Sequence, residues 1–92
     1  MAKTKSSKRS VLIVLIGKRT ETAVKLQKIL TAWGCLIKTR LGIHYGVMED
    51  CSESGLLMLE LYGEDAQKQD FAAKVAKLPG LKCQLVELEL DV

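Results

Sequence analysis

The chain has 92 residues, of which 48% are hydrophobic, and its formal net charge is +3. A domain of this length buries only roughly two thirds of the surface that its unfolded chain exposes, so a single copy is marginally stable and gains from association. The longest apolar run, Val11 to Ile16, is far shorter than the about 20 residues that cross a bilayer, and it is too short for a secretory signal. We therefore expect a cytoplasmic protein without a membrane segment.

The cysteine pattern excludes two common classes of small protein. The three cysteines, Cys35, Cys51 and Cys83, are separated by 16 and 32 residues and form no CxxC pair. An odd number at these spacings fits neither a disulfide framework nor a four-cysteine zinc site. Reduced thiols are therefore expected.

The positive charge is concentrated at the N-terminus. Lys3, Lys5, Lys8 and Arg9 carry four positive charges, so the rest of the chain has a net charge of −1 (3 minus 4). A basic tail can contact phosphate groups, but no aromatic residue or folded motif accompanies this one, which favours a solubilising role. We expect residues 1–9 to be a flexible basic tail and residues 10–92 to form one domain.

The first half of the domain is predicted to begin with a strand and a helix. Val11 to Ile16 contains only β-branched residues and leucine, which is typical of a central strand that is apolar on both faces. The following helix has Thr20 as its N-cap and ends at Gly34. Its apolar stripe has a helical spacing and consists of Ala23, Leu26, Leu30 and Trp33.

Beyond Cys35 the hydrophobic period changes to two, which predicts a second strand that ends at His44. The alternation places His44 on the same face as Lys38 and Arg40, rather than with the core. A polar loop of residues 45–54 follows. The next strand, Leu56 to Tyr62, is largely apolar on both faces.

The second half closes with a helix and a long strand. Glu64 or Asp65 can cap the helix, and Pro79 with Gly80 ends it. In the last strand the apolar positions change phase, from Leu81, Cys83 and Leu85 to Val86, Leu88 and Leu90. A bulge near Leu85, or a strand packed on both faces at this point, would explain the change.

This order of elements predicts an α+β fold, the ferredoxin-like βαββαβ sandwich, with a four-stranded antiparallel sheet and both helices on one face. The other face is then uncovered, although two of its strands are apolar on both sides. We predict a homo-oligomer, either a dimer or a tetramer, that buries this face, including Leu56, Met58 and Tyr62, or that pairs the sheet edges.

The only histidine and one cysteine stand at the two ends of the polar loop. His44 and Cys51 offer an imidazole and a thiolate, ligands that suit a transition metal such as iron, nickel, zinc or copper. A closed site would need further ligands, from a carboxylate, another cysteine or a partner subunit. Because two ligands do not define a site, a purely structural role for both residues stays open.

Catalysis and nucleic-acid binding are both disfavoured. The loop around Cys51 has no glycine arrangement for an oxyanion hole, and so short a chain leaves little room for a substrate cleft, so we expect no enzyme. RNA-recognition modules of this topology stack bases on aromatic residues of the first and third strands. The strand from Val11 to Ile16 contains no aromatic residue.

A small-molecule effector site is a further possibility. In assemblies of ferredoxin-like domains, ligands can lie between subunits against the loop after the first strand. That loop would contribute Gly17, Lys18, Arg19 and Thr20, whose two cations could meet a carboxylate or a phosphate. A solvated turn is the simpler interpretation of the same residues.

The strings TRLGIH, CSESGLLMLELYG and LPGLKCQLVELEL, with this order of elements, resemble a family of small ACT-like proteins, the iron-only hydrogenase system regulators. These proteins are similar in fold to the C-terminal sensor domain of the nickel-responsive regulator. The resemblance covers almost the whole chain. It implies an oligomeric regulatory domain that responds to a small ligand or metal and is not an enzyme, and it points to His44, Cys51 and Ser52 as ligand-binding residues.

The sequence departs from the related sensors at three places. The HxH of the nickel sensor is absent, because Gly42 stands two residues before His44, so square-planar nickel binding is not implied. The DNA-binding ribbon-helix-helix segment is missing, so direct DNA binding is not expected. The ProGly pair of amino-acid-binding ACT domains is missing near Gly17, and amino-acid binding stays open, as does an adaptor role in which the open sheet face docks a partner.

Overall fold

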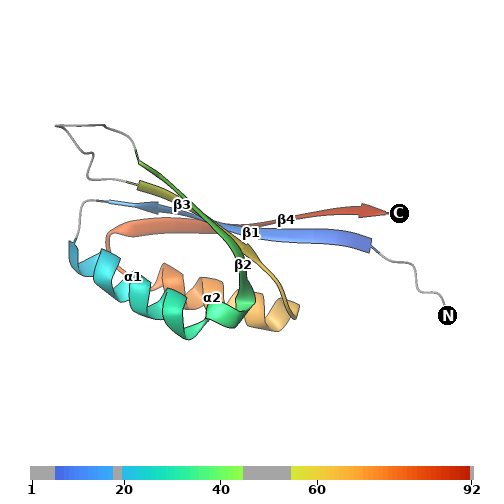
Figure 1. Cartoon of the computed structure of the whole chain (residues 1–92), viewed down its shortest axis with the longest axis horizontal. Helices are drawn as coiled ribbons and strands as arrows, with labels where there is room; N and C mark the ends of the chain where they lie inside the picture. The colour runs from blue at the N-terminus through green and yellow to red at the C-terminus, as the bar shows by residue number, and fades with distance from the viewer. Residues whose placement is uncertain (1–5, 18–19, 45–54, 92) are drawn as a thin grey trace.

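The computed structural model describes residues 6–17, 20–44 and 55–91 (Figure 1). The elements follow the predicted order, with a short 3₁₀ turn after the first helix. They are β1 (Ser6–Ile16), α1 (Thr20–Ala32), η1 (Gly34–Leu36), β2 (Ile37–His44), β3 (Gly55–Leu61), α2 (Asp65–Ala76) and β4 (Leu81–Asp91).

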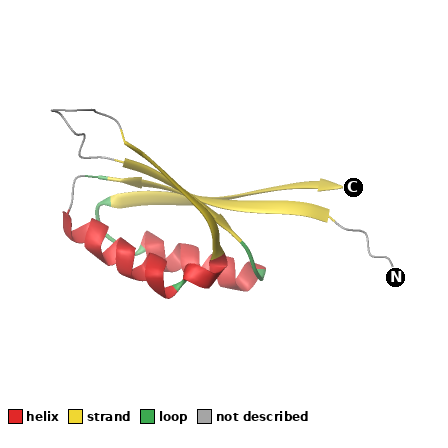
Figure 2. Ribbon diagram, viewed as in Figure 1, coloured by secondary structure: helices red, strands yellow, loops and turns green. Residues whose placement is uncertain are grey.

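The four strands form one antiparallel sheet in the order β2-β3-β1-β4. Both helices lie on the same face of this sheet, and no described helix or strand covers the other face (Figure 2). The central strand β1 pairs with β3 on one side and β4 on the other, as its two apolar faces predict. The ferredoxin-like fold predicted from the sequence is thus confirmed.

The core lies between the helices and the inner face of the sheet. Alternate residues of β1 and β3 point to this side and are buried, because successive side chains of a strand face opposite sides. Trp33 at the end of α1 packs on Phe71 of α2 with ring centroids 5.6 Å apart. The buried apolar residues are Leu12, Val14, Leu26, Leu30, Leu36, Leu57, Leu59, Leu61, Phe71 and Val75.

The turn before α2 is organised by local hydrogen bonds. Gly63 has a φ of 112°, a conformation that favours glycine. Of the two N-cap candidates in the sequence, Glu64 is the N-cap. It forms a capping box with Gln67, whose side chain accepts a hydrogen bond from the Glu64 amide at 2.9 Å. The chain therefore enters α2 in one defined direction directly after β3.

Strand β2 differs from its predicted pattern. A register shift between Ile37 and Thr39 places Ile37 opposite Leu61 of the core, whereas Leu41 faces Met58 on the open side. Arg40 pairs with the core residue Leu59 and thus lies on the helix side of the sheet. The prediction that this face of β2 is turned away from the core is therefore wrong, because the irregularity reverses the alternation after Ile37.

Strand β1 begins earlier than the sequence predicted. Ser6 to Arg9, which were assigned to the flexible tail, pair with Leu88 to Asp91 of β4. Ser10 is the most N-terminal residue of β1 that pairs with β3. On the N-terminal side of Ser10, β1 and β4 continue as a two-stranded ribbon past the helices (Figure 1). Pairing with β4 places Lys8 and Arg9 in the sheet, where a charged sequence alone indicates a tail.

The β1–β4 pairing also explains the change of phase in β4. The register runs without interruption through Leu85 and Val86, so the bulge, one of the two explanations that the sequence allowed, is not formed. Leu81, Cys83 and Leu85 pack against the core below the helices. Val86, paired with Val11, begins the series of apolar residues on the opposite, open side. The phase changes where the strand leaves the helix layer.

Candidate functional site on the open sheet face

The open face of the sheet carries apolar side chains from all four strands, and β4 also places the polar residues Gln84 and Lys82 there. The register places Ile13 opposite Met58 and Leu15 opposite Leu56. Directly opposed residues of antiparallel strands share a face, so these side chains form cross-strand pairs on the uncovered side. The described apolar residues of this open face are Val11, Ile13, Leu15, Leu41, Leu56, Met58, Val86, Leu88 and Leu90.

The ribbon extends this apolar surface. Leu88 and Leu90 are each 70% exposed and lie across from Arg9 and Ser7 on β1. Together with Val11 they line a hollow of about 600 Å³. Such an area of exposed leucine exceeds the scattered apolar residues of an ordinary surface and is typical of an interaction site.

A bidentate ion pair crosses the open face. Nε and Nη2 of Arg9 donate to the carboxylate of Glu60 at 2.5 and 2.9 Å. These hydrogen bonds hold the pKa of Glu60 below its ordinary value and raise that of Arg9. Arg9 and Glu60 therefore compensate each other's charge on the open face, whereas Lys82 lies across from Leu15 on the same face.

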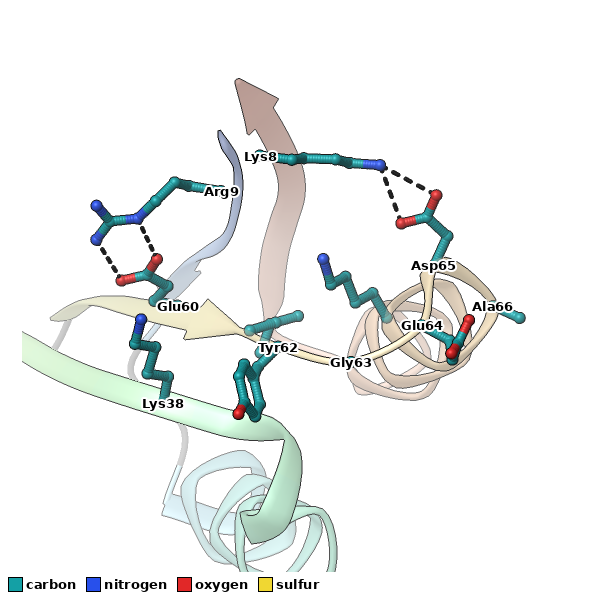
Figure 3. Close-up of a pocket in the computed structure, with 11 residues that line it drawn as sticks. Lys8, Arg9, Lys38, Glu60, Tyr62, Gly63, Glu64, Asp65 and Ala66 are labelled. Carbon is teal, nitrogen blue, oxygen red and sulfur yellow. Dashed lines mark hydrogen bonds and ion pairs between the residues drawn. The ribbon is translucent and has the colours of Figure 1, made fainter. Parts of the chain in front are cut away.

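The helix side of the ribbon is polar. Lys8 donates to both carboxylate oxygens of Asp65 at 3.0 Å (Figure 3), and this contact lowers the pKa of Asp65. Lys68, only 6% exposed, donates to Ser10 at 2.9 Å, and Ser10 donates to Glu87 at 3.1 Å. These contacts tie the base of the ribbon to the first turns of α2.

The same charges border a polar cavity of about 560 Å³ at the end of β3 (Figure 3). Two of its four cations are paired with carboxylates of the same cavity, in the Lys8–Asp65 and Arg9–Glu60 pairs, and a third, Lys68, donates to Ser10. Satisfied ion pairs offer little to a ligand, because binding would first have to separate them. We assign this cavity a structural role in holding the ribbon against α2.

The metal or ligand site predicted at the polar loop remains a prediction. His44 is the last residue of β2 and pairs with Gly55 in the register. Cys51 and Ser52 lie outside the described residues. Among the residues that the structure describes, no three histidine, cysteine or acidic side chains are grouped as metal ligands.

The predicted effector loop is described only at its ends. The amide of Gly17 donates to the carbonyl oxygen of Gly80 at 2.8 Å, and a Cβ at Gly17 would lie 3.1 Å from that oxygen. Close backbone packing is thus one reason for this glycine. Thr20 is the first residue of α1, and Lys18 and Arg19 lie outside the described residues.

Of the three residues predicted to form an oligomer face, two lie on the open side of the sheet, and the oligomer itself stays a prediction. Leu56 and Met58 lie on the open face, whereas Tyr62 follows the end of β3 and borders the polar cavity. Sequence reasoning missed Leu88 and Leu90, although the change of phase in β4 was the signal for them. It missed Arg9 because that residue was assigned to the tail.

Two other findings bear on the chemistry of the chain. Burial raises the pKa of the Cys83 thiol, which lies beside the core, whereas Cys35 is exposed.

In the described part of the chain, the helices are too short or too polar to span a membrane.

Comparison with solved structures finds the uncharacterized protein TM1266 from Thermotoga maritima. It has a TM-score of 0.74 and 19% sequence identity, over 89% of this chain and 99% of that chain. A dimeric ferredoxin-like protein from an uncultured marine organism has a TM-score of 0.49 and 6% identity, over 90% of this chain and 94% of that chain. No protein-family model matches the sequence, and neither does any curated protein. The similarity to the Thermotoga protein extends over nearly its whole length and is one of fold, the ferredoxin-like sandwich.

Proposed function

We propose that this chain is a cytoplasmic regulatory domain that acts by self-association through its open sheet face, rather than by catalysis. The observation that carries the proposal is the change of phase in β4. Where the helices end, the apolar residues move to the open face and the acidic residues Glu87 and Glu89 take the helix side. Apolar residues on one face of the ribbon are favoured when that face is buried. If water covered both faces, nothing would favour apolar residues on the open side.

The occupant that fits this face is a second copy of the chain. A two-stranded ribbon is at best marginally stable in water, so an apolar covering would stabilise Leu88 and Leu90 together with their strands. Arg9 and Glu60 neutralise each other, so this pair adds no net charge to a contact between two identical faces.

The regulatory part of the proposal rests on the resemblance to the iron-only hydrogenase system regulators. In that proposal the ligand or metal is bound near His44, Cys51 and Ser52, and binding changes the assembly. The strand β2 joins the two regions, because it contributes Leu41 to the open face and ends at His44.

The test compares one substitution on the open face with a matched substitution on a helix. Leu88→Glu adds a charge to the proposed interface, and Val24→Glu adds the same charge at a 52% exposed position of α1, on the opposite side of the molecule. Native mass spectrometry and light scattering are expected to give an oligomer for the wild type and Val24→Glu, and a folded monomer for Leu88→Glu.

Two results would contradict this proposal. A wild-type monomer at high concentration would exclude self-association and leave an adaptor that docks another protein through the same face. An oligomer that survives both Leu88→Glu and Met58→Glu would place the interface elsewhere. Circular dichroism of each variant verifies that the fold is retained.

A further inference from the structure

A second apolar cavity lies on the other side of the sheet, between α1 and the strands β2 and β3. It has a volume of about 410 Å³, within the range of small-molecule sites. Leu26, Leu30 and Leu57 form its apolar floor, and Ala23 stands on its helix wall. Ala23 belongs to the apolar stripe of α1 and is nevertheless exposed, because this cavity separates it from the sheet.

Gly42 keeps this cavity open. It lies within β2, where glycine weakens a strand and often marks close approach of a ligand or another backbone. Its backbone does not require glycine, since its φ is not in the left-handed region. A Cβ at this position would meet only Leu57 Cδ1, at 3.9 Å. Gly42 is therefore not explained by packing or by a turn, and the space above it is available to a ligand.

The polar groups of the cavity are at its rim. Arg40 donates from Nη2 to Oε1 of Gln27 at 2.7 Å, and both residues line the cavity. Among the described residues, no ion pair between Arg40 and a carboxylate is formed. A planar guanidinium that forms no ion pair with a carboxylate in the described part of the chain, and that is held beside an apolar pocket, is suited to bind a carboxylate.

We propose that this cavity binds a small apolar carboxylic acid. Its hydrocarbon body would lie over Gly42 against Leu26 and Leu57, and its carboxylate would accept hydrogen bonds from Arg40, with Gln27 holding the guanidinium in place. The biological role of this site rests on the proposed function, because the bound acid would be the small ligand to which the regulatory domain responds. The binding itself does not depend on that function. Since Leu41 contributes to the open face, a ligand above Gly42 would contact the strand that also serves assembly.

The probes are phenylacetate and hexanoate, each compared with its neutral amide. Binding is followed by amide chemical shifts of the full chain during titration. The carboxylates are expected to bind about tenfold more tightly than the amides, because only they form charge-assisted hydrogen bonds with Arg40. The largest shifts are expected in α1 and in residues 40–42.

Three substitutions separate the parts of the site. Arg40→Gln is expected to weaken carboxylate binding about tenfold and to leave the amides unchanged. Gly42→Leu and Ala23→Leu fill the cavity from opposite walls, and each is expected to weaken all four probes at least about tenfold. If Gly42→Leu does not fold, Ala23→Leu decides. Ala73→Leu, the same change at an exposed position of α2, is the control and should have no effect.

The inference is overturned if the carboxylates do not bind, if Arg40→Gln leaves their affinity unchanged, or if Ala23→Leu has no more effect than Ala73→Leu. The native mass of the same samples is measured in parallel. Loss of binding with an intact oligomer would refute only this site, whereas a monomer that still binds the carboxylates would refute only the proposed assembly.

Discussion

Lys8 and Arg9 are neighbours in the sequence, but β1 places their side chains on opposite faces of the sheet. Lys8 reaches Asp65 on the helix side, and Arg9 reaches Glu60 on the open side. Both partners are carboxylates whose pKa is lowered, in each case mainly by the hydrogen bond from the cation. Two residues that a composition argument assigns to a solvated tail thus attach the ribbon to the rest of the fold.

These ion pairs predict how stability depends on pH. Because the pKa values of Glu60 and Asp65 are lower in the folded chain than in the unfolded chain, the unfolded chain binds more protons in acid. The contribution of the pairs is present above the ordinary pKa values, which are 4.5 for Glu60 and 3.8 for Asp65. It is lost as the pH falls through the lower values of the folded state.

The measurement is urea unfolding between neutral pH and about pH 3. Glu60→Gln should reduce the loss of stability in acid compared with the wild type. Asp70→Asn, at an exposed carboxylate of α2, is the control and should leave the pH dependence unchanged. An identical acid dependence in Glu60→Gln and the wild type would refute the role of the Arg9–Glu60 pair.

At the scale of the elements, the turn between β3 and α2 determines how α2 meets the sheet. Gly63 provides the positive φ, and the capping box of Glu64 and Gln67 begins the helix one residue later. A Cβ at Gly63 would lie 2.8 Å from Gln67 Oε1 and 3.0 Å from Leu36 Cδ1. Substitution would therefore strain the backbone and also displace the side chain that caps α2.

We expect Gly63→Ala to lower the free energy of unfolding by about 1–3 kcal/mol. Gly34→Ala is the matched control, because a Cβ at Gly34 would have no neighbour within 4 Å and its φ is not positive. Chemical denaturation of both variants measures the difference. Equal stability of the two variants would show that the turn tolerates a side chain and that the positive φ is not a constraint.

At the scale of the whole molecule, a small core lies on one side of the sheet and an apolar surface on the other. Among the residues that the structure describes, ten apolar side chains form the buried core. Nine further described apolar side chains lie on the open face, and an assembly that covers this face would bury them. In the proposed assembly, stability would be shared between folding and association.

If the folded chain is stabilised by association, its melting temperature must depend on protein concentration. A hundredfold increase in chain concentration adds about 2.7 kcal/mol to the apparent stability of a dimer. We expect the melting temperature of the wild type to rise over this range and that of Leu88→Glu to stay constant. Calorimetry at several concentrations tests this, and a constant melting temperature for the wild type would contradict obligate association.

The order of the elements, the central position of β1, the cap of α2 and the uncovered sheet face all follow from the sequence. They depend on short-range patterns: the period of the apolar residues, the residues at helix ends and the lengths of the segments. Leu56 and Met58 were recognisable as residues of the open face because both faces of their strand are apolar.

Only the tertiary structure determined the features that depend on contacts between distant segments. The irregularity after Ile37 reversed the faces of β2, pairing with β4 turned Ser6 to Arg9 into a strand, and the space beside Gly42 became visible once α1 lay across the sheet. The physical reason is that the burial of a strand face depends on what packs above it. A sequence pattern records that a face is apolar, whereas the fold determines which element, or which second chain, covers it.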